Sequence, residues 1–336
     1  MMLQAVAKSE LSLGAPKLNL GKLEATRAAS VQRTLKQTVN FEGVGLHSGK
    51  PASLTVRPAP AGHGVKFRRT DIALGDTTVP ASWDAVEQGP LCTKVVNSSG
   101  VSVSTIEHVM AALAGCGIFN ALLELDGPEV PILDGSAAPF VKRFLEVGLQ
   151  SLEQPVWAVR ILRDVEVSRG EAWARLSPAD EMQIDFSIDF EDEAIGRQHK
   201  ALNMANGSFV RELCDSRTFC RQSDVDAMHE QGLALGGTLE NAVVVEGANV
   251  LSPGGLRHAD EAVRHKMLDA LGDLALAGAP ILGVYTGSRA GHAMTNALLR
   301  KLFETEGAFC FVRCTAEQAA RLPGAGVHLG EMPQVA

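Results

Sequence analysis

The segment of this sequence with the most chemical potential runs from Glu261 to Asp273 and carries acidic and imidazole side chains at helical spacing. At about 100° per residue, His265, Asp269 and Asp273 share one face of a helix, and Lys266 lies beside them. Most other positions of this segment are apolar, which is typical of a buried helix. Because a buried charge without a partner is too costly to persist, we expect this polar stripe to meet partners inside a cleft.

Two members of the stripe, His265 and Asp269, are four residues apart, so both side chains can reach a single cation. Imidazole and carboxylate ligands suit zinc, and a catalytic zinc keeps three protein ligands and one open position. Iron(II) is equally compatible with two histidines and one carboxylate. The alternative is structural: an ion pair within the helix, with Asp273 capping a neighbouring group.

The third ligand is offered by Ser104-Thr-Ile-Glu-His108, which opens a shorter predicted helix. His108 can bind a metal, and the adjacent Glu107 can act as general base toward water whose pKa the metal lowers to about 7. The alternative is again structural, because Ser104 and Glu107 have the spacing of a helix capping box. His292 ends a glycine-containing stretch that we expect to be a flexible loop. It could donate a proton as a cation, or be a solvated bystander.

These residues need a scaffold, and the pattern indicates an α+β fold in which strands followed by a pair of helices occur twice. In the first half, strands are expected within 34–57, 64–79 and 120–125, and helices at 104–115 and 139–147. In the second half, strands are expected at 158–167, 172–176, 183–190 and 281–286, and helices at 260–278 and from about 293. A faint likeness between the segments that begin at His108 and His265 supports a duplication.

We therefore divide the chain into two domains with flanking segments. Residues 1–33 are expected to be a flexible N-terminal extension, and 321–336 a C-terminal tail. Domain I, 34–154, supplies Glu107 and His108, and domain II, 155–320, supplies His265 and Asp269.

Length and composition narrow the class of protein. The chain has 336 residues, of which 46% are hydrophobic and 21% charged, as in globular proteins with two ordinary domains. No apolar run approaches the roughly 18 residues that span a bilayer. The net charge of −8 argues against a nucleic-acid binder. Six scattered cysteines without a Cys-x-x-Cys pair predict reduced thiols, and without a secretory signal we expect a cytoplasmic protein, as a monomer.

Seven motifs occur in an order that resembles one known family. They are Gly43-Val-Gly-Leu-His-Ser-Gly49, Thr105-Ile-Glu-His108, Leu133-Asp-Gly-Ser-Ala-Ala-Pro-Phe140, Ser216-Arg-Thr-Phe219, Leu233-Ala-Leu-Gly-Gly-Thr-Leu-Glu-Asn-Ala242, Arg264-His-Lys-Met-Leu-Asp-Ala-Leu-Gly-Asp273 and Gly291-His292. From about 34 to 312 the chain resembles the UDP-3-O-acyl-N-acetylglucosamine deacetylases (LpxC family) of lipid A biosynthesis in Gram-negative bacteria.

The resemblance implies a zinc-dependent amidase that removes acetate from a UDP-linked, 3-O-acylated N-acetylglucosamine. The zinc ligands would be His108, His265 and Asp269. Glu107 would be the general base that activates zinc-bound water for attack on the amide. His292 would be the general acid.

The same resemblance implies roles for the residues around this centre. Asp273 would favour the charged form of the general acid, and Thr218 would donate a hydrogen bond to the oxyanion. Contacts with the substrate would come from Lys266, His47 and Phe219.

The fold implied by the resemblance is a pair of similar α+β domains, each a sheet packed on helices with one small insert. The second insert, about 219–245, would form an apolar passage for the acyl chain. Its apolar residues could line such a passage or be ordinary core: Met228, Leu233, Leu235 and Leu239. The alternative function is a non-catalytic binding module in which the polar stripe forms a buried ion-pair network.

Overall fold

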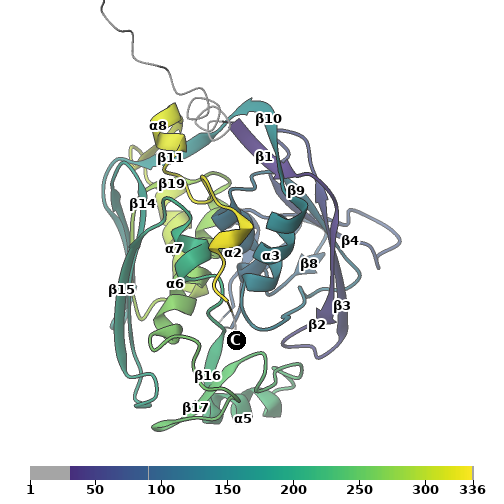
Figure 1. Cartoon of the computed structure of the whole chain (residues 1–336), viewed down its shortest axis with the longest axis vertical. Helices are drawn as coiled ribbons and strands as arrows, with labels where there is room; N and C mark the ends of the chain where they lie inside the picture. Colours follow the sequence, from purple (N-terminus) through teal and green to yellow (C-terminus); the bar gives the residue numbers. More distant parts are fainter. Residues whose placement is uncertain (1–30, 90, 335–336) are drawn as a thin grey trace, which may run out of the picture.

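The computed structural model describes residues 31–89 and 91–334 (Figure 1). The expected N-terminal extension thus lies outside the described residues up to position 30. Its last three positions belong to strand β1 (Val31–Leu35), which pairs antiparallel with β10 (Leu149–Pro155). Within the two described ranges, no helix is both long and apolar enough to cross a membrane.

The first half of the chain builds a five-stranded sheet. Its strands follow the order β2 (Val39–Val44), β3 (Pro51–Pro58), β9 (Ala121–Leu125), β4 (Val65–Arg69) and β5 (Thr78–Pro80). Only β4 and β9 run parallel, and the other neighbours are antiparallel. Alternate residues of β3, such as Leu54 and Val56, are buried, so one face of the sheet packs on the core.

The second half repeats this topology within a seven-stranded sheet. The corresponding order is β12 (Val165–Arg169), β13 (Ala172–Pro178), β19 (Ile281–Ser288), β14 (Met182–Asp189) and β15 (Arg197–Asn203), again with only the third and fourth strands parallel. Two further strands, β11 (Trp157–Ile161) and β20 (Phe309–Arg313), extend the sheet beyond β19. The single strand expected at 158–167 is therefore wrong: it is two strands, because the exposed polar pair Arg163 and Asp164 interrupts the apolar pattern.

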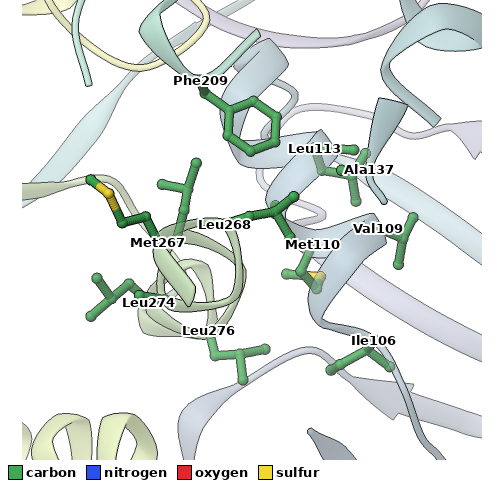
Figure 2. Packing of buried hydrophobic residues seen from close by; sticks show 14 of the residues in the cluster. Ile106, Val109, Met110, Leu113, Ala137, Phe209, Met267, Leu268, Leu274 and Leu276 are labelled. Atoms are coloured by element: carbon green, nitrogen blue, oxygen red, sulfur yellow. The ribbon is translucent and has the colours of Figure 1, made fainter. Parts of the chain in front are cut away.

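Four helices lie between the two sheets, and each half contributes a helix–strand–helix unit (Figure 1). These helices are α2 (Glu107–Cys116), α3 (Ala138–Val147), α6 (Glu261–Leu274) and α7 (His292–Glu304). The order α2-β9-α3 in the first half matches α6-β19-α7 in the second, which confirms the α+β class. A 3-10 turn, η2 (Ala275–Ala277), continues α6. Buried side chains of α2, among them Met110 and Leu113, pack in one cluster with Leu268 and Leu274 of α6 (Figure 2).

Each half also carries a small three-stranded insert between its sheet and its first core helix. In the first half it consists of β6 (Val86–Glu87), β7 (Lys94–Val96) and β8 (Ser102–Val103), preceded by η1 (Trp83–Ala85). In the second half it consists of β16 (Phe219–Arg221), α5 (Gln222–Glu230), β17 (Val243–Glu246) and β18 (Asn249–Val250), preceded by α4 (Ser208–Glu212). This insert ends a few residues beyond the expected limit at about 245.

The last described segment packs against the body of the protein. After α8 (Ala316–Ala319), Leu322 is buried, and the guanidinium of Arg33 donates to the carbonyl of Gly324 at 2.9 Å. A short 3-10 turn, η3 (Leu329–Glu331), follows. Strand pairing changes at Pro155, next to the expected domain boundary, and the division into two domains stays a prediction.

A glycine lets α6 approach the start of α2 closely. A Cβ atom at Gly272 would lie 2.1 Å from the carbonyl oxygen of Glu107 and 3.1 Å from the backbone nitrogen of Ala111. Both obstacles are backbone atoms, which cannot rotate away. The side chains that leave α2 and α6 near this contact are therefore held close together.

We expect Gly272→Ala to lower the free energy of unfolding by about 1–2 kcal/mol, although alanine favours helix, because overpacking outweighs the helix preference. Urea unfolding followed by circular dichroism measures this. Gly127→Ala is the matched control: no atom lies within 4 Å of its added Cβ, and we expect a change below about 0.5 kcal/mol. Equal stability of the two variants would contradict the close contact.

Candidate active site

Helices α2 and α6 bring three metal-ligating side chains together. His108 comes from α2, and His265 and Asp269 come from α6; one ligand atom from each lies within 4.8 Å of the others. The Oδ1 atom of Asp269 is 3.7 Å from Nε2 of His108 and 3.2 Å from Nε2 of His265. Ligands around a tetrahedral zinc at its usual bond lengths stand about 3.3 Å apart. The arrangement therefore has the dimensions of a site for one divalent cation.

The protonation and orientation of these three side chains also fit a cation. Nδ1 of His265 lies 3.0 Å from the carbonyl oxygen of Ser216, so its N–H donates there and the Nε2 lone pair faces Asp269. Burial lowers the pKa of His265. Burial and the neighbouring His265 together lower the pKa of His108 to about 3. Both imidazoles are therefore neutral.

The carboxylate of Asp269 gives the clearest indication. Burial would raise its pKa, but His265 and Lys266 outweigh this and hold the pKa well below its usual range. Its Oδ2 accepts from Nζ of Lys266 at 2.8 Å. Among the described residues its buried Oδ1 has no hydrogen-bond partner, and an ionised oxygen in that position calls for a cation. The donor set thus fits the metal that the sequence predicts.

Glu107 and His292 stand beside this cluster as a potential base and acid. Burial raises the pKa of Glu107 to about 7. Burial alone would lower the pKa of His292, but Asp273, 2.8 Å from its Nδ1, and Glu107 raise it to about 9. Nε2 of His292 lies 3.8 Å from Oε1 of Glu107. A group able to accept a proton therefore faces a group able to donate one.

One local expectation around this pair is wrong, and two structural alternatives are not observed. His292 is the first residue of α7, not part of a flexible loop, because the extended backbone of Gly291 forms the N-cap and the residues after it are helical. Its side chain is only 10% exposed, so it is not a solvated bystander. The capping box also does not form: Ser104 donates to the carbonyl of Pro128, and Glu107 accepts from the backbone N–H of Thr93 at 3.0 Å.

The cluster opens into a cavity of about 800 Å³. Its walls include the four remaining residues that the sequence proposed for substrate and oxyanion contacts: Thr218, Phe219, Lys266 and His47. Both ring nitrogens of His47 are buried and without a hydrogen-bond partner among the described residues. The ring of Phe219 meets that of His265 edge-on, with centroids 6.2 Å apart.

Apolar residues of the second insert also line the cavity. Met228, Leu233 and Leu239 line it, and none of the three side chains is fully buried, so they are not ordinary core. Leu235 is different: it is 56% exposed and does not line the cavity. Its backbone N–H instead donates to the carbonyl of His47 at 3.2 Å, which docks the insert on the turn of the first half.

Two contributors to the site are not assigned a role by the sequence. Ser216 acts through its backbone carbonyl, which any residue could supply. Thr93 acts through a long-range hydrogen bond from its hydroxyl to Asp273, 180 positions away along the chain, at 2.5 Å. Only the three-dimensional arrangement identifies them.

Comparison with known proteins identifies close relatives over most of the chain. A family profile described as "UDP-3-O-acyl N-acetylglycosamine deacetylase" matches residues 32–304. Proteins named UDP-3-O-acyl-N-acetylglucosamine deacetylase from Pasteurella multocida and Shewanella violacea are 44% and 43% identical, each over 86% of this chain and 95% of the relative. The protein of that name from Histophilus somni is 44% identical over 84% of this chain and 92% of its own length.

We expect His265→Ala and Asp269→Ala to lose stoichiometric binding of Zn²⁺. Each variant keeps only two of the three protein ligands that a catalytic zinc needs. Metal content after dialysis, measured by inductively coupled plasma mass spectrometry, checks this. His258→Ala is the control, since its imidazole binds Asp215 outside the cluster and the variant should keep its metal. Full zinc occupancy in either ligand variant would contradict the site.

Proposed function

This chain belongs to the family of UDP-3-O-acyl-N-acetylglucosamine deacetylases, and we propose on that basis that it removes acetate from a UDP-linked, 3-O-acylated N-acetylglucosamine in lipid A biosynthesis. The observation that carries the proposal is the juxtaposition of the His108, His265 and Asp269 cluster with Glu107 and His292 at one end of a cavity. All six cysteines are free, which supports a reducing compartment such as the cytoplasm.

We propose that His108, His265 and Asp269 hold a zinc ion, with iron(II) as the alternative that the same ligands accept. A divalent cation there supplies Lewis acidity toward the amide carbonyl and lowers the pKa of water. Asp269 contributes the negative charge of the set, and the two neutral imidazoles keep the total charge compatible with an open coordination position.

The protein's own groups move the protons. Glu107 takes a proton from the attacking water through Oε1, the oxygen that faces His292, while the water oxygen bonds to the amide carbonyl carbon. Thr218, in the cavity wall, donates a hydrogen bond to the carbonyl oxygen as it gains charge. His292 then gives its Nε2 proton to the glucosamine nitrogen as the C–N bond breaks. The acid formed passes its remaining proton to the amine, so that acetate and the protonated amine leave, and the proton taken by Glu107 returns to His292.

The cavity supports this substrate class at both ends. Lys266 and His47 offer polar contacts near the reacting amide and the sugar nucleotide, and Phe219 offers an aromatic surface beside them. The apolar end, formed by Met228 and Leu239, suits a fatty acyl chain.

The alternative, a non-catalytic module with a buried ion-pair network, is less consistent with the cluster. A network that exists for stability pairs each of its buried polar atoms. Here Oδ1 of Asp269 is without a hydrogen-bond partner among residues 31–89 and 91–334, at the position where three ligand atoms converge.

We expect the purified protein to release acetate from UDP-3-O-acyl-N-acetylglucosamine, and Glu107→Gln to lower kcat by roughly 10²- to 10⁴-fold, because an amide cannot accept the proton. Coupled acetate detection measures turnover, and metal content confirms that the variant is loaded. No acetate release by the metal-loaded wild type would overturn the proposed activity.

The pH profile of kcat/KM should be bell-shaped. Activity rises with pH as Glu107, whose pKa burial raises to about 7, becomes ionised, and falls as His292, with a pKa of about 9, loses the proton that it must donate. A cation beside these groups favours their deprotonated forms and moves both limbs to lower pH. Glu107→Gln should abolish the acidic limb while the alkaline limb remains; an unchanged acidic limb would exclude Glu107 as the base.

A further inference from the structure

Thr93 lies between the two carboxylates that flank His292, although it belongs to the insert of the first half. It directly precedes β7 and is only 3% exposed. All three of its polar groups are engaged: its N–H donates to Glu107 Oε2 at 3.0 Å, its hydroxyl donates to Asp273 Oδ1 at 2.5 Å, and its carbonyl accepts from Ile106 N–H at 3.4 Å. The residue therefore connects the first half to α6.

These contacts close a ring of four residues. From Glu107 the ring passes through Thr93 to Asp273, then from Asp273 Oδ2 to His292 Nδ1 at 2.8 Å. It returns from His292 Nε2 to Glu107 Oε1 across 3.8 Å. Each carboxylate thus gives one oxygen to Thr93 and turns the other toward His292.

The ring decides which atoms are free for chemistry. A carboxylate can rotate and exchange its two oxygens, and a histidine held through one nitrogen can pivot with its partner. Because Thr93 occupies Oε2 of Glu107, Oε1 is the oxygen that remains for an incoming proton. Because Thr93 also holds Oδ1 of Asp273, the Oδ2 atom that orients His292 is fixed relative to Glu107.

We propose that Thr93 is a positioning residue that aligns the general base Glu107 with the Asp273–His292 acid pair across the two halves. The inference rests on the proposed function, since it assigns roles within that reaction. The hydroxyl is the decisive group, because the backbone N–H would survive substitution of the side chain. Its loss leaves Asp273, itself buried, with one oxygen lacking this donor and free to turn.

The test compares Thr93→Val, which keeps shape and N–H but removes the hydroxyl, with Thr93→Ser, which restores the hydroxyl. With metal-loaded protein and the UDP-sugar substrate, we expect Thr93→Val to lower kcat by about 10- to 100-fold with KM changed less than about threefold. Thr93→Ser should recover most of the lost kcat. In an Asp273→Asn background, Thr93→Val should cost much less, because the partner charge is already gone.

A matched control separates positioning from folding. Thr34 is also 3% exposed, and its hydroxyl donates to the Asn120 carbonyl at 2.7 Å in the first half, away from the cavity. Thr34→Val should lower the unfolding midpoint while leaving kcat within about twofold. If wild-type protein turns over and Thr93→Val keeps its kcat, or if both threonine variants lose kcat only in proportion to stability, the positioning role is wrong. If the wild type itself is inactive, the proposed function fails instead.

Discussion

The close contact between α2 and α6 is the constraint on which the rest of the structure depends. It places His265, Asp269 and Asp273 in buried positions, where an unpaired charge is costly. His108 and Thr93 provide partners from the other half of the chain. Ser216, Lys266 and His292 provide partners from the same half. Packing of the two halves against each other therefore completes part of the site, since the hydroxyl that bonds Oδ1 of Asp273 comes from the first half.

The sequence predicts those parts of the fold and of the site that depend on residues close together in the chain. The spacing of His265, Asp269 and Asp273 within one helix fixes their common face, and the two helix–strand–helix units follow from apolar periodicity. The helix that begins at His292 is expected from about 293, one residue late, and His292 itself is assigned to the preceding loop because the glycines there conceal an N-cap. Thr93 could not be predicted at all, because its role depends on a hydrogen bond between segments far apart in the chain, for which a single sequence has no local pattern.

The cavity joins two chemically different environments in one volume. Charged lining residues come from α2 and α6, whereas most of the apolar ones come from the insert of the second half, which docks on the turn that carries His47. A Cβ atom at Gly236 would lie 2.2 Å from the carbonyl oxygen of Gly45, so this docking is as close as the contact between the core helices. An amphiphilic ligand that spans the cavity thus touches both halves at once.

The two halves share the same order of strands and helices but differ in the residues at the site. Both copies place a histidine on their first core helix, but where α6 has Asp269 four residues after its histidine, α2 has Ala112. A fully twofold pocket would present the same surroundings to a ligand in either of two opposed orientations. Because a carboxylate stands four residues after the histidine in α6 but not in α2, the pocket is asymmetric. A ligand therefore meets different surroundings in its two opposed orientations.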